Sequence, residues 1–324
     1  MRTRGPEVAL GVEGVAVGHW TDERWRTGCT VVLPPPGTMG GASVRGGAPG
    51  TREVPALGAS GSGLECHGIL LTGGSAFGLA AADGVMRWLA ERRRGVPVGP
   101  RVVPVVGGAN LLDLRTADQP TPGPEAGHAA CEVASTEEPT TGSVGVGAGC
   151  MVGKTAGVEH AVAGGVGLGI ASHGDLTAGA LVAANAVGDV VGPGGEVLAG
   201  DRAPVEAERY PFGGPLLGAL GGEEGRAHTV IGCVATNARL DKSGAVRAAE
   251  LSHGGLVRAV RPAHTQLDGD CLFLLATGQR EAPVDAVAAL AAEAVATAVR
   301  MGVRDATDLP GAPADPRAKL FDEV

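Results

Sequence analysis

The chain reads Gly225-Arg226-Ala227-His228-Thr229-Val230-Ile231-Gly232-Cys233-Val234-Ala235-Thr236-Asn237 where a Gly-rich connection gives way to an apolar strand. A cut before Thr229 would give this residue both a hydroxyl and a free α-amine. Such an amine titrates at about pH 8 and takes the proton of its own hydroxyl, so one residue supplies nucleophile and base. A threonine that begins a strand is, however, more often an ordinary β-former beside solvent.

Composition limits the partners that the chain can bind. The formal net charge is −9 and the sequence pI is about 5.4, which disfavours phosphate backbones and anionic membranes. Aromatic residues make up only 2% of the 324 residues, whereas there are 56 glycines, so small side chains must fill the core. We therefore expect no nucleic-acid partner and no membrane partner.

The cysteines and histidines indicate neither a metal site nor a cofactor. The six cysteines are scattered in apolar segments without a CxxC pair, and no histidine pair has zinc-ligand spacing. No secretory signal opens the chain. We therefore predict reduced core cysteines, a cytoplasmic protein, and an ordinary loop role for His264.

Hydrophobic periodicity predicts strands and helices mixed within one domain. Strands are expected at 12–17, 29–33, 102–106, 166–172, 176–191, 229–235 and 271–276, and helices at 75–93, 242–260 and 284–301. Residues 116–142 are predicted to form a loop. Residues 192–228 are rich in Gly, Pro and acids, and are predicted to form a flexible connection in which a cut costs little.

Several blocks along the chain resemble a known family. From roughly residue 10 to residue 305 the chain is similar to the L-aminopeptidase/D-esterases, β-peptidyl aminopeptidases and nylon-oligomer hydrolases. The blocks that carry the resemblance are Gly14–His19, Thr27–Val32, Arg45–Glu53, Leu71–Leu79, His228–Arg239 and Arg261–Asp270.

The resemblance implies an α+β fold with two sheets between helical layers, a four-layer αββα sandwich. It implies a single domain that cuts itself between His228 and Thr229 into two chains. Residues 1–228 would form the large part and residues 229–324 the small part, which begins at the nucleophile. A homotetramer of processed protomers acting on a small peptide or amide is also implied.

Lys154 and Asn185 stand out because lysine and asparagine each occur only three times in the chain. The resemblance implies that Lys154 lies beside the nucleophile, where its charge disfavours protonation of the Thr229 amine. It also implies that Asn185 donates a hydrogen bond to the oxyanion. The alternatives are a surface lysine at a helix start and an amide in a turn or bulge.

Asp268 and Asp270 flank Gly269 before a predicted strand. Alternate residues of an extended segment face the same way, so both carboxylates can point at one site. The resemblance implies that they orient the free amine and pass protons. The alternative is an Asp-Gly turn that leads into a strand.

Two positions depart from the family. His228 stands where Asn or Gly is common, and Leu112 or a neighbour stands where an aromatic residue, often Tyr, is expected. Leu112 has no side-chain donor, and Asn110 or backbone N–H groups could compensate for it in the substrate cleft.

The sequence therefore predicts an autoprocessed hydrolase, an aminopeptidase or amidase, with Thr229 as nucleophile. Acyl transfer of the ornithine acetyltransferase type is one alternative. An unprocessed, non-catalytic binding protein on the same fold is the other.

Overall fold

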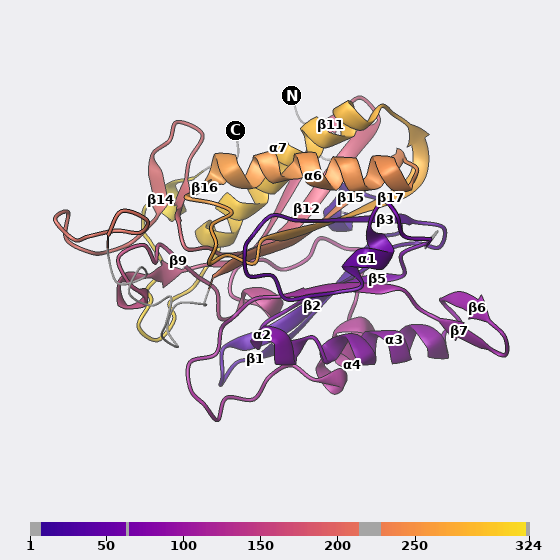
Figure 1. Ribbon diagram of the computed structural model, residues 1–324, viewed down its shortest axis with the longest axis horizontal. Helices are drawn as coiled ribbons and strands as arrows, with labels where there is room; N and C mark the ends of the chain where they lie inside the picture. The colour runs from indigo at the N-terminus through magenta and orange to yellow at the C-terminus, as the bar shows by residue number, and fades with distance from the viewer. Residues whose placement is uncertain (1–7, 63–64, 214–227, 322–324) are drawn as a thin grey trace.

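Two five-stranded sheets pack face to face between two pairs of helices (Figure 1). The computed structural model describes residues 8–62, 65–213 and 228–321. Because helices and sheets are mixed along the whole chain, the α+β class predicted from the sequence is confirmed.

The first sheet has the strand order β1-β2-β5-β8-β4. Its strands are β1 (Ala16–Asp22), β2 (Thr27–Leu33), β5 (Gly68–Thr72), β8 (Val106–Asn110) and β4 (Thr51–Arg52). The helices α3 (Ala81–Glu91) and α4 (Pro124–Glu132) cover its outer face. Val31 of β2 and Leu70 of β5 pack there against Val85 of α3.

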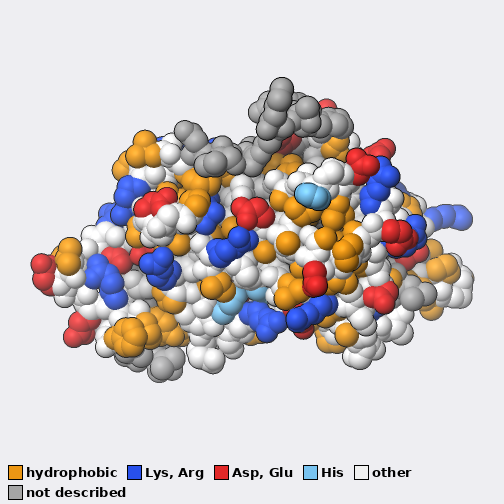
Figure 2. All heavy atoms as spheres, turned by 90° about the horizontal axis from the view of Figure 1, so that it is seen from above, with side chains coloured by type: hydrophobic (Ala, Val, Ile, Leu, Met, Phe, Trp, Pro, Cys, Tyr) orange, Lys and Arg blue, Asp and Glu red, His pale blue; other side chains and the backbone are white. Residues whose placement is uncertain are grey.

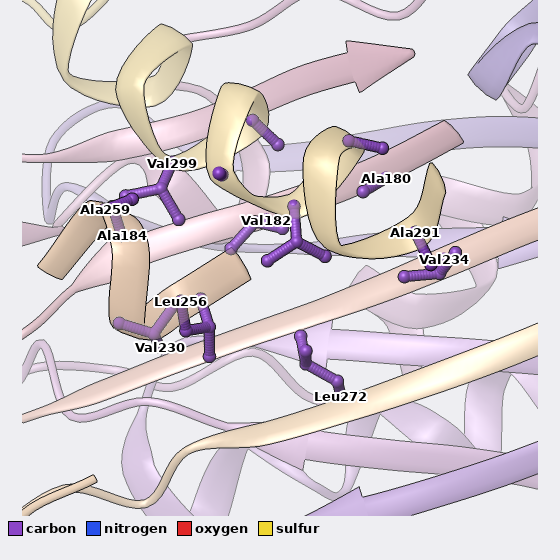
Figure 3. Close-up of a cluster of buried hydrophobic side chains, with 14 of the residues drawn as sticks. Ala180, Val182, Ala184, Val230, Val234, Leu256, Ala259, Leu272, Ala291 and Val299 are labelled. Carbon is purple, nitrogen blue, oxygen red and sulfur yellow. The ribbon is translucent and has the colours of Figure 1, made fainter. Parts of the chain in front are cut away.

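The second sheet has the strand order β11-β12-β15-β17-β3. Its strands are β11 (Gly165–His173), β12 (Leu176–Asn185), β15 (Thr229–Arg239), β17 (Cys271–Glu281) and β3 (Met39–Val44). The helices α6 (Lys242–Ala259) and α7 (Val284–Arg304) cover its outer face. Figure 3 shows Val182 and Val234 of this sheet in one buried cluster with Leu256 of α6 and Val299 of α7.

A third cluster of apolar side chains fills the space between the sheets. Leu71 of β5 and Ala109 of β8 lie there with Ile231 of β15 and Phe273 of β17, all fully buried. Small residues let the layers approach closely: a Cβ added at Gly167 of β11 would lie 2.0 Å from the carbonyl oxygen of Ala298 in α7. The small-residue core expected from the composition is therefore present.

Shorter elements connect these layers. The remaining strands are β6 (Val96–Val98), β7 (Arg101–Val103), β9 (Met151–Val152), β10 (Val162–Ala163), β13 (Asp189–Val191), β14 (Val197–Ala199) and β16 (Val260–Arg261). Within the described residues, the other helices are α1 (Val54–Leu57), α2 (Ser75–Gly78) and the 3-10 turns Ala9–Gly11, Gly145–Gly147, Val158–His160 and Ala318–Leu320.

Some predicted elements were wrong. Residues 102–106 do not form a buried strand: β7 pairs with β6 in a hairpin with little burial, and the buried strand is the next one, β8. Residues 116–142 contain the helix α4, and the predicted helix 75–93 is split into α2 and α3. The strand predicted at 12–17 begins only at Ala16, and the one at 176–191 is split into β12 and β13. Of the connection expected at 192–228, residues 214–227 lie outside the described residues, and the described part contains the strand β14.

The outer face of α6 and α7 carries charges of both signs. Arg247 pairs with Glu250, and Arg258 of α6 pairs with Glu293 of α7 at 3.0 Å. Figure 2 shows acidic and basic side chains interspersed over this face. By length and composition α7 could cross a membrane, but its buried side chains pack against β11 and β12, as those of a core helix do.

Candidate active site

Thr229 is the first residue of β15, in the middle of the second sheet. The register of β12 and β15 places it directly opposite Asn185, the last residue of β12. Opposite residues of an antiparallel pair have neighbouring side chains. The fold therefore brings two of the predicted site residues together, and Thr229 is only 5% exposed there.

The peptide bond before Thr229 is buried within the same site. The Thr229 hydroxyl donates to the carbonyl oxygen of His228, and the backbone N–H of Gly269 donates to the same oxygen at 3.2 Å. His228 also forms a parallel bridge with Asp268. The bond predicted to be cut thus lies against the predicted nucleophile, and its carbonyl oxygen already has a backbone donor.

Lys154 is fully buried, and its side chain contacts Asn185, the residue opposite Thr229. Its Nζ donates to the backbone oxygen of Asn185 at 3.0 Å and to Asn185 Oδ1 at 3.1 Å. Burial lowers the pKa of Lys154 to about 7, against the opposing effects of Cys150 and Asp268. The surface position that was the alternative for this lysine is wrong, and its amine can exchange a proton near neutral pH.

Further contacts fix the orientation of the Asn185 amide. The N–H of Met151 donates to Asn185 Oδ1 at 2.9 Å, and Asn185 Nδ2 donates to the carbonyl oxygen of Leu112 at 3.3 Å. Leu112 thus reaches the site through its backbone, which no side-chain pattern reveals.

Asp270 holds the backbone of the residue that follows the nucleophile. Its Oδ1 accepts from the N–H of Val230 at 2.7 Å. Its Oδ2 accepts from the N–H of His264 at 3.0 Å and contacts His264 Nδ1 at 2.7 Å. The carboxylate of Asp270 therefore connects His264 to the nucleophile strand.

Asp268 anchors the other side of the site. Its Oδ1 accepts from the N–H of Val187 at 3.3 Å, and its Oδ2 accepts from the N–H and hydroxyl of Thr265 at 2.9 and 2.6 Å. Burial, and then the neighbouring charge of Asp270, raise the pKa of Asp268 above its ordinary value. Both aspartates are 1% exposed and lie just before the strand β17, so both carboxylates are buried, and their role in the site stays a prediction.

Asn110 is the last residue of β8 and packs against the turn at Gly50. Its N–H donates to the oxygen of Gly50 at 3.0 Å, and a Cβ added at Gly50 would lie 2.0 Å from Asn110 Nδ2. The same turn reaches the aspartates, because the N–H of Ala48 donates to the oxygen of Asp268 at 2.9 Å. Among the described residues, Asn110 Nδ2 is buried and has no hydrogen-bond partner.

Sequence reasoning missed the contribution of His264, Thr265 and the N–H of Gly269. The histidine and threonine precede the two aspartates within one short loop, which was the available signal. Among residues 8–62, 65–213 and 228–321, no group of three His, Cys, Asp or Glu side chains could hold a metal ion. The six cysteines are buried and free.

The model of peptidase family S58 matches residues 10–315. This chain belongs to peptidase family S58. The family predicted from the sequence is thereby confirmed.

Several curated relatives of this S58 chain are named as aminopeptidases or as oligomer hydrolases. An uncharacterized aminopeptidase of Mycobacterium tuberculosis (strain H37Rv) is 41% identical over 335 residues, covering 93% of this chain and 95% of the relative. The 6-aminohexanoate-oligomer endohydrolase of Kocuria sp. is 29% identical over 289 residues, covering 87% of this chain and 79% of the relative. The S58 chain is thus a hydrolase similar to aminopeptidases and amidases.

Solved structures of low sequence identity share the fold. The L-aminopeptidase D-Ala-esterase/amidase of Ochrobactrum anthropi, described as a variant of the N-terminal nucleophile hydrolase fold, has a TM-score of 0.71 at 20% identity, covering 99% of this chain and 94% of its own. A β-aminopeptidase of Burkholderia sp. has a TM-score of 0.70 at 23% identity, with the same coverage.

Proposed function

We propose that this chain is a self-processing amide hydrolase whose nucleophile is Thr229. One observation carries the proposal. The Thr229 hydroxyl donates a hydrogen bond to the carbonyl oxygen of His228, and the N–H of Gly269 donates to that same oxygen. A nucleophile beside a carbonyl with a preorganised donor is the arrangement that acyl transfer requires.

Processing begins with attack of Thr229 Oγ on the carbonyl carbon of His228. The bond from that carbon to the Thr229 nitrogen breaks, and the hydroxyl proton passes to the nitrogen. An ester on Oγ and a free α-amine remain. Water hydrolyses the ester and releases the large part, residues 1–228, with a carboxylate at His228.

Turnover repeats this chemistry on a substrate. The α-amine takes the proton of Oγ, which attacks the amide carbonyl, and the leaving amine receives the proton. Asn185 Nδ2 and the N–H of Gly269 are the proposed oxyanion donors, and Lys154, Asp268 and Asp270 set the charge around the amine. Water then releases the acid. The relatives are named as aminopeptidases and hydrolases, which favours water over an amine as acceptor.

Intact mass and amino-terminal sequencing test the proposal. The purified chain of 32.0 kDa should give two fragments, the smaller beginning at Thr229, and should hydrolyse aminoacyl p-nitroanilides. Thr229→Ala should remain one inactive species, whereas the matched control Thr229→Ser keeps a hydroxyl and should still be cut. A single uncut species without activity for the natural sequence would support a binding protein. An uncut chain that hydrolyses amides at full rate would also refute the proposal.

A further inference from the structure

The side chain of His228 occupies a closed space in the uncut chain. The residue is 1% exposed, and neither ring nitrogen has a hydrogen-bond partner among the described residues. Burial, and then the charge of Lys154, lower the pKa of His228 to about 2, so the ring is neutral. The space therefore accommodates a medium-sized, uncharged ring, and the described residues around it form no hydrogen bond with that ring.

The two esters of the proposed chemistry have the same connectivity at the enzyme. In processing, the acyl group of His228 is bound to Thr229 Oγ beside a newly freed α-amine. In turnover, the acyl group of the substrate is bound to the same Oγ beside the same amine. The carbonyl oxygen of His228 already accepts from the N–H of Gly269 at 3.2 Å, and the substrate carbonyl must use a donor at the same place.

We propose that the space now filled by the His228 side chain is the acyl-side pocket of the mature enzyme, and that it selects substrates whose acyl residue has an uncharged, medium-sized side chain. This inference rests on the proposed function, because the pocket is emptied only when the cut fragment end leaves.

Electrostatics and volume set the selectivity of this pocket. A cationic side chain would be desolvated near Lys154, and an anionic one near the buried Asp268, which pairs with the backbone of His228. A much larger ring would overfill a space that encloses an imidazole. Substrates with a histidine or leucine acyl group should therefore react faster than substrates with a lysine, glutamate or tryptophan acyl group.

Two series of measurements test the proposed pocket, and their rankings are compared with each other. The first is the self-cleavage rate of freshly translated chains with His228→Leu, His228→Lys, His228→Glu or His228→Trp, followed by intact mass. The second is kcat/KM of the processed natural enzyme on the p-nitroanilides of His, Leu, Lys, Glu and Trp. The two rankings should agree, with the uncharged medium-sized groups faster by about tenfold or more.

Controls separate this inference from the function on which it rests. In the Thr229→Ala background His228→Leu should unfold close to the temperature of Thr229→Ala alone, whereas His228→Lys, His228→Glu and His228→Trp should unfold at lower temperatures, because the same closed space disfavours these side chains in the folded chain. Processed His228→Leu should rank the anilides as the natural enzyme does, since position 228 is no longer joined to the nucleophile. Preference for lysine or glutamate anilides, or unrelated rankings in an enzyme that is cut and active, would overturn the pocket. If a variant fails to fold, the anilide ranking of the natural enzyme decides alone. A natural chain that stays whole and inactive would instead refute the proposed function.

Discussion

Lys154 is a buried amine whose burial opposes folding. It is completely buried, and its Nζ donates to both oxygens of Asn185. Burying an ammonium is unfavourable, which is why the pKa of Lys154 falls to about 7. Before the cut no α-amine exists at Thr229, so we propose that a neutral Lys154 beside Asn185 relays the hydroxyl proton to the Thr229 nitrogen during self-cleavage.

The first prediction concerns self-cleavage by Lys154→Met. Methionine fills a similar volume without an amine, so we expect cleavage to slow by about 100-fold or more. In the natural chain the cleavage rate should rise as pH increases through about 7, where Lys154 loses its proton. Time courses of intact mass between pH 5.5 and about 9 measure both effects. A variant cut at the natural rate, or a natural rate that falls with rising pH, would contradict this role.

Stability provides the control for Lys154→Met. The folded chain binds fewer protons than the unfolded chain between about pH 7 and the ordinary lysine pKa of 10.5, so stability should rise with pH in that range. In the uncut Thr229→Ala background, Lys154→Met should therefore unfold at a higher temperature below pH 7. That advantage should shrink as pH rises towards 10.5.

The second prediction is that His264 positions Asp270. His264 contacts one oxygen of Asp270 through both its N–H and its ring, while the other oxygen accepts from Val230. Its φ of 57° lies in the left-handed region, which asparagine also tolerates. We expect His264→Ala to lower kcat by about 10–100-fold with little change in KM. His264→Asn keeps the backbone and a side-chain donor and should recover most of the activity; equal loss in both variants would refute a positioning role.

Two adjacent glycines of α6 give a prediction at the scale of elements. A Cβ added at Gly255 would lie 2.2 Å from the carbonyl oxygen of Ala292 in α7, whereas one at the exposed Gly254 would meet nothing within 4 Å. Gly255→Ala should therefore separate the helices and cost about 1–3 kcal/mol. Gly254→Ala should stabilise by about 0.4–1 kcal/mol because it restricts the unfolded chain. Denaturant unfolding of each glycine variant in the uncut Thr229→Ala background measures both changes in stability. Equal changes would show that α6 and α7 are not in close contact at Gly255.

The elements that the sequence predicted are those whose own residues determine them. The strand at Thr229 and the helices α6 and α7 have strong periodicity and appear close to the expected bounds. β8 was misplaced because its sequence, VGGAN, contains few strand-forming residues; it is a strand because it pairs with β5 and β4 in the core. α4 was missed although Pro124 at its start was a usable signal.

The residues of the site divide in the same way into those that the local sequence identifies and those that only the folded chain reveals. Side chains with unusual local context, such as Lys154 and Asn185, could be selected from the sequence. The N–H of Gly269 and the oxygen of Leu112 could not, because a backbone group becomes a donor or acceptor only through the path of distant strands. The register that sets Asn185 opposite Thr229 is likewise a property of the folded sheet.

At the scale of the whole molecule, the proposed cut divides a single sheet between two chains. The strands β15 and β17 would belong to the small part, yet they lie between β12 and β3 of the large part. The helices α6 and α7 of the small part also cover the sheet and contact β11, β12 and β3. The expected tetramer and the cytoplasmic location stay predictions, and native mass spectrometry tests the first.

This interleaving predicts that the two fragments remain one folded unit after cleavage. Separating them would break the pairing of β12 with β15 and of β17 with β3, and would expose the core beneath α6 and α7. The fragments should co-elute in gel filtration at the volume of uncut Thr229→Ala. They should also unfold in a single transition, as that variant does. Only denaturant should separate them. Loss of the small fragment on a native column would mean that the shared sheet does not hold the processed molecule together.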